Sequence, residues 1–288
     1  MTVKELYLSV KEILAKGNIP DPAFEAAFLM EETLGYSRSK IIVFGDSVVS
    51  ALQQEKLLDM AKRRADGEPL QYITGKWYFM DIPFEVGYGV LIPREDTQVC
   101  VDICIEELKK FKERKMQVLD LCAGSGAISV AISKYCGNAQ VTAVERSRDA
   151  YEYLLKNIYL NKADVKAVRG DIFYPENFIK DEKFDIIVSN PPYIKSEDIL
   201  TLQKEVQQEP EMALDGGTEG LDFYRFITTK YTDYLNTGGL LVYELGEGQF
   251  PFVKDMMTEA GFENIEPRFD IGGVKRAVFG TLKRKLEI

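Results

Sequence analysis

A glycine-rich turn between an apolar strand and a helix constrains the fold of this chain more than any other feature. Residues 118–121 form a short apolar run, Gly124-Ser125-Gly126 follows, and apolar residues then recur at helical spacing from 128 to 135. Strand, glycine turn and helix in this order form the first unit of a doubly wound α/β sheet. Glycine has no Cβ, so the turn can approach a ligand closely. The sequence therefore predicts a ligand-binding α/β domain.

A different pattern precedes this domain. Residues 1–65 carry the apolar spacing of short helices. One helix is expected to begin at Pro22 with Asp21 as its N-cap, and another to cover 50–64 with Leu52 turned inward. These residues predict a small helical bundle.

The residue composition changes again between residues 67 and 96. Tyr72-Ile73, Trp77-Tyr78-Phe79 and Phe84-Glu85-Val86 indicate a linking β-hairpin. From about residue 96, helix and strand patterns alternate, which is typical of a mainly parallel sheet. The expected division is a helical domain over 1–70, a hairpin linker over 71–95 and a doubly wound α/β domain over 96–288.

Composition excludes several kinds of chemistry. The chain of 288 residues has no histidine, which excludes Ser-His-Asp and Cys-His catalysis and any His-ligated metal site. Its four cysteines form no Cys-x-x-Cys pair, so we expect reduced thiols and no metal. A formal net charge of −10 disfavours a direct nucleic-acid partner. No apolar run is long enough to span a bilayer and no secretion signal is evident, so we predict a cytoplasmic protein without a membrane partner.

Acidic residues follow the next two predicted strands. Glu145 lies 19 residues beyond Gly126, where a carboxylate can accept both hydroxyls of a ribose. Asp171 follows the third strand and can accept from an adenine amino group while Ile172 packs on the ring. These positions share the edge where α/β sheets bind ligands. The expected cofactor residues are Cys122, Ala123, Gly124, Ser125, Gly126, Glu145, Asp171, Ile172 and Asn190.

This arrangement fits a nicotinamide or flavin dehydrogenase as well as a methyltransferase. The dinucleotide motif requires glycine or alanine at the position of Ser129, and its turn must hold a pyrophosphate. S-adenosylmethionine has no pyrophosphate. The combined pattern therefore favours S-adenosylmethionine as the cofactor.

Asn190-Pro191-Pro192-Tyr193 directly follows the apolar run 184–189. Neither proline has an N–H, and residues before proline adopt extended geometry, so the carbonyls are not consumed by a helix. The Asn190 carboxamide oxygen and the Pro191 carbonyl can therefore accept from one planar –NH2 group. The same four residues also fit a stiff turn that ends a buried strand. By itself the motif does not separate these two interpretations.

Several segments together resemble one known family. They are 69–75 (PLQYITG), 91–97 (LIPREDT), 124–128 (GSGAI), 189–194 (SNPPYI), Glu209-Pro210, 214–217 (LDGG), Gly220-Leu221, and Asp270 with Arg276. On these segments the chain resembles the HemK/PrmC protein-(glutamine-N5) methyltransferases over nearly its whole length. One departure is that the family usually has Gly-Thr where this chain has Cys122-Ala123.

The resemblance implies a seven-stranded methyltransferase domain and a helical domain that helps to dock the substrate. It implies methyl transfer from S-adenosylmethionine, which becomes S-adenosylhomocysteine, to the glutamine of the Gly-Gly-Gln motif in class-I peptide chain release factors. Such a reaction modulates translation termination. We expect a monomer.

Within that reading, the Asn-Pro-Pro-Tyr motif binds the substrate amide. Asn190 Oδ1 and the Pro191 carbonyl are expected to accept its two N–H bonds while Tyr193 packs on the flat carboxamide, so that no strong base is needed. The expected catalytic residues are Asn190, Pro191 and Tyr193, with Pro192 added for substrate binding. Asp120 is expected to order the glycine turn.

Alternatives remain open on the sequence alone. The target glutamine can belong to a ribosomal protein, or the acceptor can be an amino group of DNA or RNA, which the acidic balance disfavours. A cofactor-binding scaffold without turnover is the non-enzyme alternative. Arg94 and Asp96-Thr97 fit either a wall of the cofactor pocket or a structural ion pair, and Glu209 and Asp215 are placed at the rim.

Overall fold

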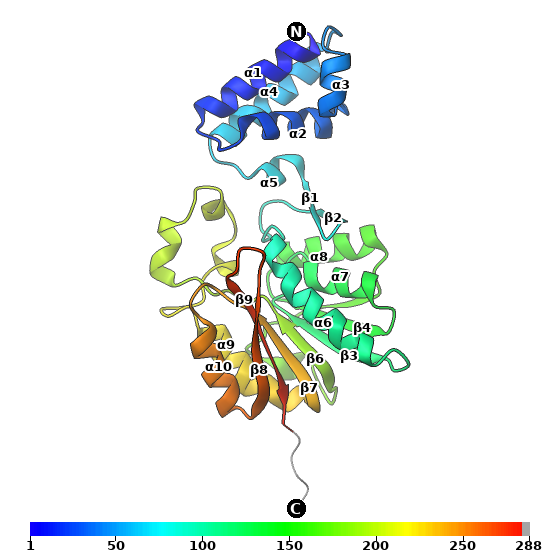
Figure 1. Cartoon of the computed structure of the whole chain (residues 1–288), viewed down its shortest axis with the longest axis vertical. Helices are drawn as coiled ribbons and strands as arrows, with labels where there is room; N and C mark the ends of the chain where they lie inside the picture. Colours follow the sequence, from blue (N-terminus) through cyan, green and yellow to red (C-terminus); the bar gives the residue numbers. More distant parts are fainter. Residues whose placement is uncertain (284–288) are drawn as a thin grey trace, which may run out of the picture. The chain divides into compact units, whose positions relative to one another are not determined.

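The computed structural model describes residues 1–283, which form two compact units. The helical unit contains Met1–Lys76 together with 203–208, and the α/β unit contains Trp77–Leu202 together with 209–283. Figure 1 shows the elements of both units in sequence colours. Within residues 1–283, no helix combines the length and apolarity needed to cross a membrane.

The helical unit is a bundle, as the sequence predicts. Its helices are α1 (Val3–Lys16), α2 (Pro22–Leu34), α3 (Arg38–Val43), α4 (Ala51–Ala65) and the single turn α5 (Leu70–Thr74). The predicted cap is confirmed, because the Asp21 side chain accepts from the Phe24 N–H over 2.9 Å and Pro22 occupies the first turn. The core holds Leu6, Leu14 and Leu57.

Two expectations for this region are wrong. Leu52 is 78% exposed. It lies five residues before the buried Leu57, about 140° away around a helix of 3.6 residues per turn. Tyr72 and Ile73 lie in α5 instead of a strand. Gly75, at φ 74°, ends this single turn in the left-handed conformation that glycine adopts freely.

The α/β unit is built on a seven-stranded sheet, which confirms the predicted fold class. The strand order is β5-β4-β3-β6-β7-β9-β8, parallel from β5 to β7 and antiparallel at β9 and β8. The strands are β3 (Met116–Leu121), β4 (Ala139–Glu145), β5 (Val165–Arg169), β6 (Phe184–Ser189), β7 (Leu235–Glu244), β8 (Phe262–Phe269) and β9 (Lys275–Leu282). A separate hairpin pairs β1 (Lys76–Phe79) with β2 (Ile82–Glu85).

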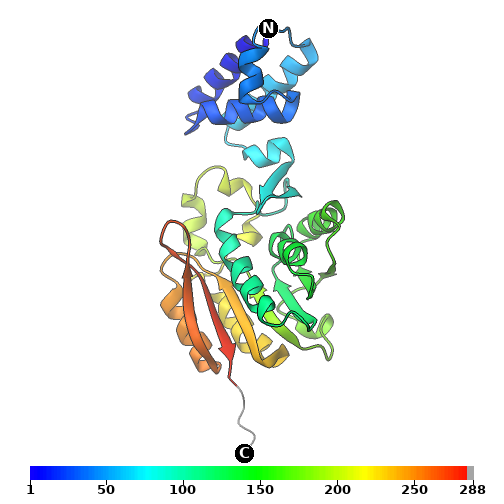
Figure 2. The same ribbon diagram turned by 45° about the vertical axis from the view of Figure 1, so that its right-hand side comes forward.

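Helices cover both faces of this sheet. They are α6 (Gln98–Lys110), α7 (Ala127–Tyr135), α8 (Arg148–Asn161), α9 (Asp222–Lys230) and α10 (Phe250–Glu259). Successive β3 side chains point to opposite faces. Val118 joins the core under α6 and α7, and Leu119 joins the core under α9 and α10. Figure 2 shows these two helical layers with the sheet between them.

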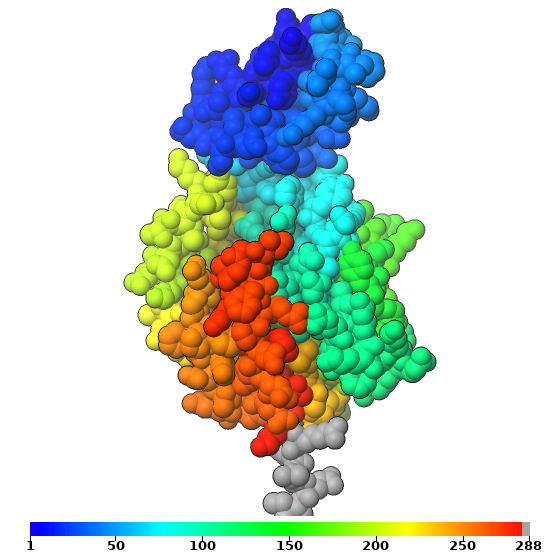
Figure 3. All heavy atoms as spheres, in the orientation of Figure 1, coloured from blue at the N-terminus to red at the C-terminus, as the bar shows by residue number. Residues whose placement is uncertain are grey.

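The C-terminal hairpin of β8 and β9 closes one edge of the sheet. Figure 3 shows this hairpin, in orange and red, on the surface of the α/β unit. Arg268 of β8 makes a two-pronged ion pair with Glu106 of α6, with N–O distances of 2.9 and 2.8 Å. At the carboxyl ends of the parallel strands, loops leave the sheet, and the predicted site residues lie there.

Candidate active site

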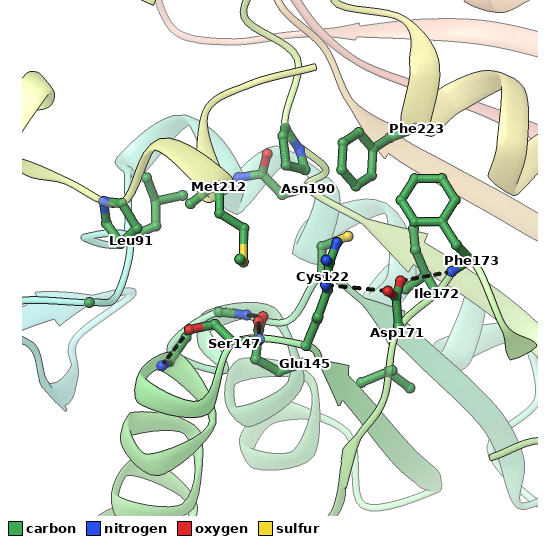
Figure 4. A pocket seen from close by; sticks show the side chains of 18 residues that line it. Leu91, Cys122, Glu145, Ser147, Asp171, Ile172, Phe173, Asn190, Met212 and Phe223 are labelled. Atoms are coloured by element: carbon green, nitrogen blue, oxygen red, sulfur yellow. Dashed lines mark hydrogen bonds and ion pairs between the residues drawn. The ribbon is translucent and has the colours of Figure 1, made fainter. Parts of the chain in front are cut away.

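A hollow lies at the carboxyl ends of β3, β4, β5 and β6. Cys122, Gly124, Glu145, Asp171, Ile172, Asn190 and Pro192 line it, so the structure brings most of the predicted residues together (Figure 4). Its lining is mainly apolar with a few polar groups, which is typical of small-molecule sites. The turn residues Ala123, Ser125 and Gly126, and Pro191 and Tyr193 of the motif, are not part of its wall.

The glycine turn has three residues in the left-handed region. Cys122, Gly124 and Gly126 have φ values of 60°, 54° and 83°. A Cβ on Gly124 would meet no atom within 4 Å, so this residue leaves an open cradle at the hollow. A Cβ on Gly126 would lie 2.5 Å from Leu154 of α8, so that glycine serves helix packing. Cys122 thus takes the backbone conformation that the family's usual glycine adopts without strain.

Glu145 orders the turn from the neighbouring strand. Its Oε2 accepts from the Gly124 backbone N–H over 2.8 Å, and its Oε1 accepts from the Ser147 N–H over 2.7 Å. The side chain is 8% exposed. Burial raises the pKa of this carboxyl, and the backbone hydrogen bonds oppose that rise. Each oxygen keeps a second lone pair for a ligand hydroxyl.

Asp171 and Ile172 form the far wall of the hollow. Asp171 Oδ1 accepts from the Phe173 N–H over 3.0 Å, and Arg146 lies 3.3 Å from Oδ2. Ile172 is buried, and its carbonyl accepts from the Tyr231 hydroxyl over 2.9 Å. The ring of Phe173 packs against Phe223, with the centroids 5.4 Å apart. This wall presents an apolar surface beside a carboxylate, which suits a purine ring with an exocyclic amino group.

The Asn-Pro-Pro-Tyr motif leaves the end of β6 in an ordered arrangement. The Asn190 amide Nδ2 donates to the Thr97 hydroxyl over 3.2 Å. Within residues 1–283, no group donates to Asn190 Oδ1, so this acceptor is available to a ligand in the hollow. The Tyr193 hydroxyl donates to Glu244 over 3.4 Å at the back of the motif.

The segment around Arg94 serves two purposes. Arg94 is paired with Glu209, which also accepts from the Ile92 N–H over 3.0 Å. Glu209 is therefore a buried residue that anchors the segment around Arg94, and it does not line the hollow. Thr97 contacts the motif directly, as described above. The ion-pair interpretation fits Arg94 and also Asp96, which pairs with Arg276 over 3.2 Å. Thr97 bonds Asn190 but, like Arg94 and Asp96, does not line the hollow.

Residue-level reasoning missed part of the wall. Leu91, Met212 and Phe223 also line the hollow. Leu91 stands in the 91–97 segment, whose resemblance to the family could have indicated it. Phe223 lies in the first turn of α9, where its spacing matches that of an ordinary core residue. No local pattern marks it as a site residue.

Known proteins match this chain over nearly its full length. Residues 5–75 match the family model described as the PrmC N-terminal domain, and 99–219 match the methyltransferase small domain. A release factor glutamine methyltransferase of Geobacter sulfurreducens is 38% identical over 282 residues, covering 98% of this chain and 97% of the relative. One from Clostridium acetobutylicum is 35% identical over 286 residues, covering 98% and 99%. The chain belongs to the release factor glutamine methyltransferase family.

A solved structure supports the fold independently. A 16S rRNA N2 methyltransferase of T. thermophilus, in complex with AdoMet and guanosine, superposes with a TM-score of 0.52 at 20% identity. The match covers 73% of this chain and 50% of that one. At this identity the similarity shows the shared methyltransferase fold.

S-adenosylmethionine is the cofactor of this methyltransferase family member, and the hollow fits it. The cradle at Gly124, the oriented carboxylate of Glu145 and the Asp171–Ile172 wall suit its amino acid, ribose and adenine parts.

Ser129 stands where the dinucleotide motif requires glycine or alanine, so it disfavours a dinucleotide as the ligand. Its N–H and its hydroxyl both donate to Asp120 Oδ2, so the buried carboxylate holds the first turn of α7. The expected role of Asp120 is therefore corrected in one respect, since its partner is this helix start and not the glycines.

Proposed function

We propose that this chain transfers the methyl group of S-adenosylmethionine to the side-chain amide nitrogen of the glutamine in the Gly-Gly-Gln motif of class-I peptide chain release factors. The observation that supports it most is the Asn190 carboxamide, whose Nδ2 is engaged by Thr97 while Oδ1 remains an acceptor at the hollow. An oriented acceptor next to the cofactor hollow suits an –NH2 substrate.

The chain's own residues have three tasks in this reaction. Bound S-adenosylmethionine supplies an electrophilic methyl group on its sulfonium. Glu145 accepts from the ribose hydroxyls, Asp171 accepts from the adenine amino group, and Ile172 packs on the ring. The other residues of this cofactor site are Cys122, Ala123, Gly124, Ser125, Gly126 and Asn190.

The amide acceptor is bound by the motif. A glutamine amide nitrogen is a weak nucleophile because its lone pair is delocalised into the carbonyl. Asn190 Oδ1 and the Pro191 carbonyl accept its two N–H bonds, which raises the electron density on nitrogen and orients it toward the cofactor. Pro192 and Tyr193 pack beside the carboxamide. The new N–CH3 bond replaces the S–CH3 bond, and S-adenosylhomocysteine is the leaving group. The methylated nitrogen then loses one proton to solvent, so position and preorganised charge require no general base to act before the transfer.

A surface groove favours a protein over a nucleic acid as substrate. Tyr193 and Ile194 line it together with residues of α10, among them Phe252 and Met256. Its charged lining consists of Asp198, Glu219, Glu247, Asp255 and Glu259 against Lys195 and Arg225. Such an excess of carboxylates repels a phosphate backbone. The groove is accessible to an extended polypeptide that carries the glutamine.

The assembly and location belong to the same proposal. We infer a monomer that acts in the cytoplasm without a direct nucleic-acid partner. The net charge of −10 and the four free cysteines support this inference. Light scattering coupled to gel filtration tests the monomer, because a dimer would have twice the 32.7 kDa mass of the chain.

One transfer assay tests the function. The purified chain receives radiolabelled S-adenosylmethionine and one of four acceptors: an unmethylated release factor, its Gly-Gly-Ala variant, a ribosomal protein fraction, or DNA and RNA. Label on the intact release factor alone supports the proposal. Label on the ribosomal fraction or on the nucleic acids would assign the reaction to that substrate instead. Cofactor binding without label on any acceptor would indicate a scaffold without turnover.

A further inference from the structure

A buried carboxamide lies between the β1–β2 hairpin and the glycine turn. Asn157 belongs to α8, and its exposed fraction is 0%. A polar side chain buried this completely is costly unless hydrogen bonds satisfy it. Asparagine is also a poor helix former, and α8 carries it in its interior. None of the roles described so far accounts for a carboxamide at this position.

One face of α8 contacts the cofactor site. Ala150 lines the hollow, and Leu154 packs so close to the glycine turn that a Cβ on Gly126 would lie 2.5 Å from it. Asn157 follows three residues after Leu154, so its side chain lies on the same face of the helix. Asn161 lies one turn further along and is also buried. This face thus carries two apolar residues near the hollow and two buried carboxamides beyond them.

The Asn157 carboxamide makes three hydrogen bonds. Its Oδ1 accepts from the Glu85 N–H over 2.6 Å, and its Nδ2 donates to the Glu85 carbonyl over 3.0 Å. The side chain therefore pairs with the backbone of β2 as a neighbouring strand would, and Figure 1 shows β2 next to α8. Nδ2 also donates to the Ser125 carbonyl of the glycine turn over 3.0 Å. One side chain thus bridges two backbone segments that are remote in the sequence.

A carboxamide meets the needs of all three backbone groups. The Glu85 N–H needs an acceptor, while the Glu85 and Ser125 carbonyls need donors, and an amide group supplies one acceptor oxygen and two N–H donors. The same needs fix its orientation, because a flipped amide would place its oxygen against both carbonyls. Ser125 is itself buried, so a lost bond would leave its carbonyl poorly solvated.

The segment that follows β2 continues into the wall of the hollow. Gly89 and Leu91 line the hollow a few residues beyond Glu85. Between these points the chain lies close against α8, since a Cβ on Gly87 would lie 2.2 Å from the Tyr153 hydroxyl. The buried carboxamide therefore acts on two parts of the cofactor site, on the glycine turn directly and on this segment through β2.

We propose that Asn157 is a positioning residue for cofactor binding, which holds the glycine turn and the segment 85–91 in the arrangement that S-adenosylmethionine requires. Both pieces of backbone are fixed before the ligand arrives, so less conformational entropy is lost on binding. The link is reciprocal: a docked hairpin favours the cofactor, and the bound cofactor stabilises the docked hairpin by the same factor. The inference concerns the cofactor alone and does not depend on which acceptor is methylated.

The first test compares the two carboxamides of α8. Asn157→Ala removes the bonds to Glu85 and Ser125 and should weaken the binding of S-adenosylhomocysteine at least about tenfold, as measured by isothermal titration calorimetry. Asn161→Ala is the matched control. Asn161 Nδ2 donates to the Pro83 carbonyl of the same strand over 2.8 Å and, among the described residues, its side chain makes no hydrogen bond to the glycine turn. Equal affinities in the two variants would overturn the proposal.

A second substitution separates hydrogen bonding from packing. Asn157→Leu fills a similar volume without any polar atom. A residue that only completes the packing of α8 would be replaced by leucine with the cofactor affinity of the folded protein intact. We expect instead that Asn157→Leu loses affinity to the same extent as Asn157→Ala. Affinity restored by leucine would contradict the positioning role.

A third test begins with the unaltered protein. Glu85 does not line the hollow, so direct contact with the cofactor does not protect its amide. Addition of S-adenosylhomocysteine should nevertheless slow hydrogen exchange of the Glu85 amide at least about threefold, as followed by NMR. The slowing should be lost in Asn157→Ala and retained in Asn161→Ala. Unchanged exchange at Glu85 in the unaltered protein would overturn the coupling, even if the Asn157 variants did not fold.

These binding measurements contain no methyl acceptor. Failure to methylate release factors would therefore leave this inference standing, and its failure would leave the proposed acceptor standing.

Discussion

The backbone N–H of Gly124 donates to Glu145 Oε2 over 2.8 Å and thereby ties the glycine turn after β3 to the end of β4. The Ser147 N–H holds the other oxygen over 2.7 Å. The carboxylate is therefore oriented before any ligand arrives, which reduces the entropy lost when a ribose binds. One side chain shapes both the cradle and the ribose contact.

Glu145→Ala should accordingly weaken the binding of S-adenosylmethionine by about 1–3 kcal/mol, the range for lost hydrogen bonds to a charged group. Isothermal titration calorimetry measures this change. Glu152→Ala is the control, because Glu152 is an exposed residue of α8 that pairs with Arg148 on the surface. Unchanged affinity in Glu145→Ala would remove the ribose contact from the proposal.

Asn190→Ala should reduce turnover at least about 100-fold while preserving most of the affinity for S-adenosylmethionine, because the lost acceptor is preorganised for the substrate amide. Single-turnover transfer to a release factor measures the effect. Asn236→Ala removes a carboxamide of the same kind at the other end of β6, where Asn236 Nδ2 donates to Asp185 over 2.9 Å. Turnover should be retained there. A small effect of Asn190→Ala would exclude the side chain from the mechanism.

Local patterns predicted the strands and the residues at their ends well. The apolar run 184–189 coincides with β6, and Glu145, Asp171 and Asn190 meet at one hollow because parallel strands end at the same edge. The contact between Asn190 and Thr97 joins residues 93 positions apart, which no spacing rule relates. Leu52 shows a different limit, since an apolar residue of an amphipathic helix can still face solvent.

Cys122 adopts φ 60°, which costs a residue with a Cβ roughly 1–2 kcal/mol relative to glycine. The Cys122→Gly variant should therefore be more stable than the Cys122→Ala variant by about that amount, although an alanine variant is usually more stable than a glycine variant. Urea unfolding of both variants measures the difference. The same pair of substitutions at Cys136, where φ is −132°, should follow the usual order. Equal behaviour at both positions would exclude strain at Cys122.

Asp120 makes stability depend on pH. Burial raises the pKa of its carboxyl to about 7, while its bonds to Ser129 oppose the rise. A group with a higher pKa in the folded state contributes stability that is complete below its unfolded pKa of about 4 and is lost as pH rises through about 7. Each unit of difference corresponds to about 1.4 kcal/mol.

The free energy of unfolding should therefore fall between about pH 5 and pH 8, and Asp120→Asn should flatten this decline. Asparagine can still accept from the Ser129 N–H, so the start of α7 keeps one bond. Urea titrations at both pH values provide the measurement. Part of the decline in the free energy of unfolding should remain in the variant, because burial also raises the pKa of the Glu244 carboxyl. A variant as pH-dependent as the parent would show that Asp120 stays ionised.

Arg64 connects two distant parts of the helical unit. Its guanidinium binds Glu25 of α2 over 2.7 and 3.1 Å and Glu205 over 2.9 Å, although the side chain is buried. Arg64→Ala leaves these carboxylates without their cation, so it should destabilise the helical unit by about 3–5 kcal/mol. Hydrogen exchange of the α2 and α4 amides measures this loss locally.

Arg63→Ala serves as the control, because the Arg63 side chain is 42% exposed and pairs with Glu68. A more exposed pair of this kind contributes less than about 1 kcal/mol. Glu205→Gln should increase exchange mainly in 203–208, because it weakens the bond that attaches this segment to α4 while Arg64 keeps Glu25. If Arg64→Ala and Arg63→Ala changed exchange equally, burial of the Arg64 ion pair would not be what stabilises the unit.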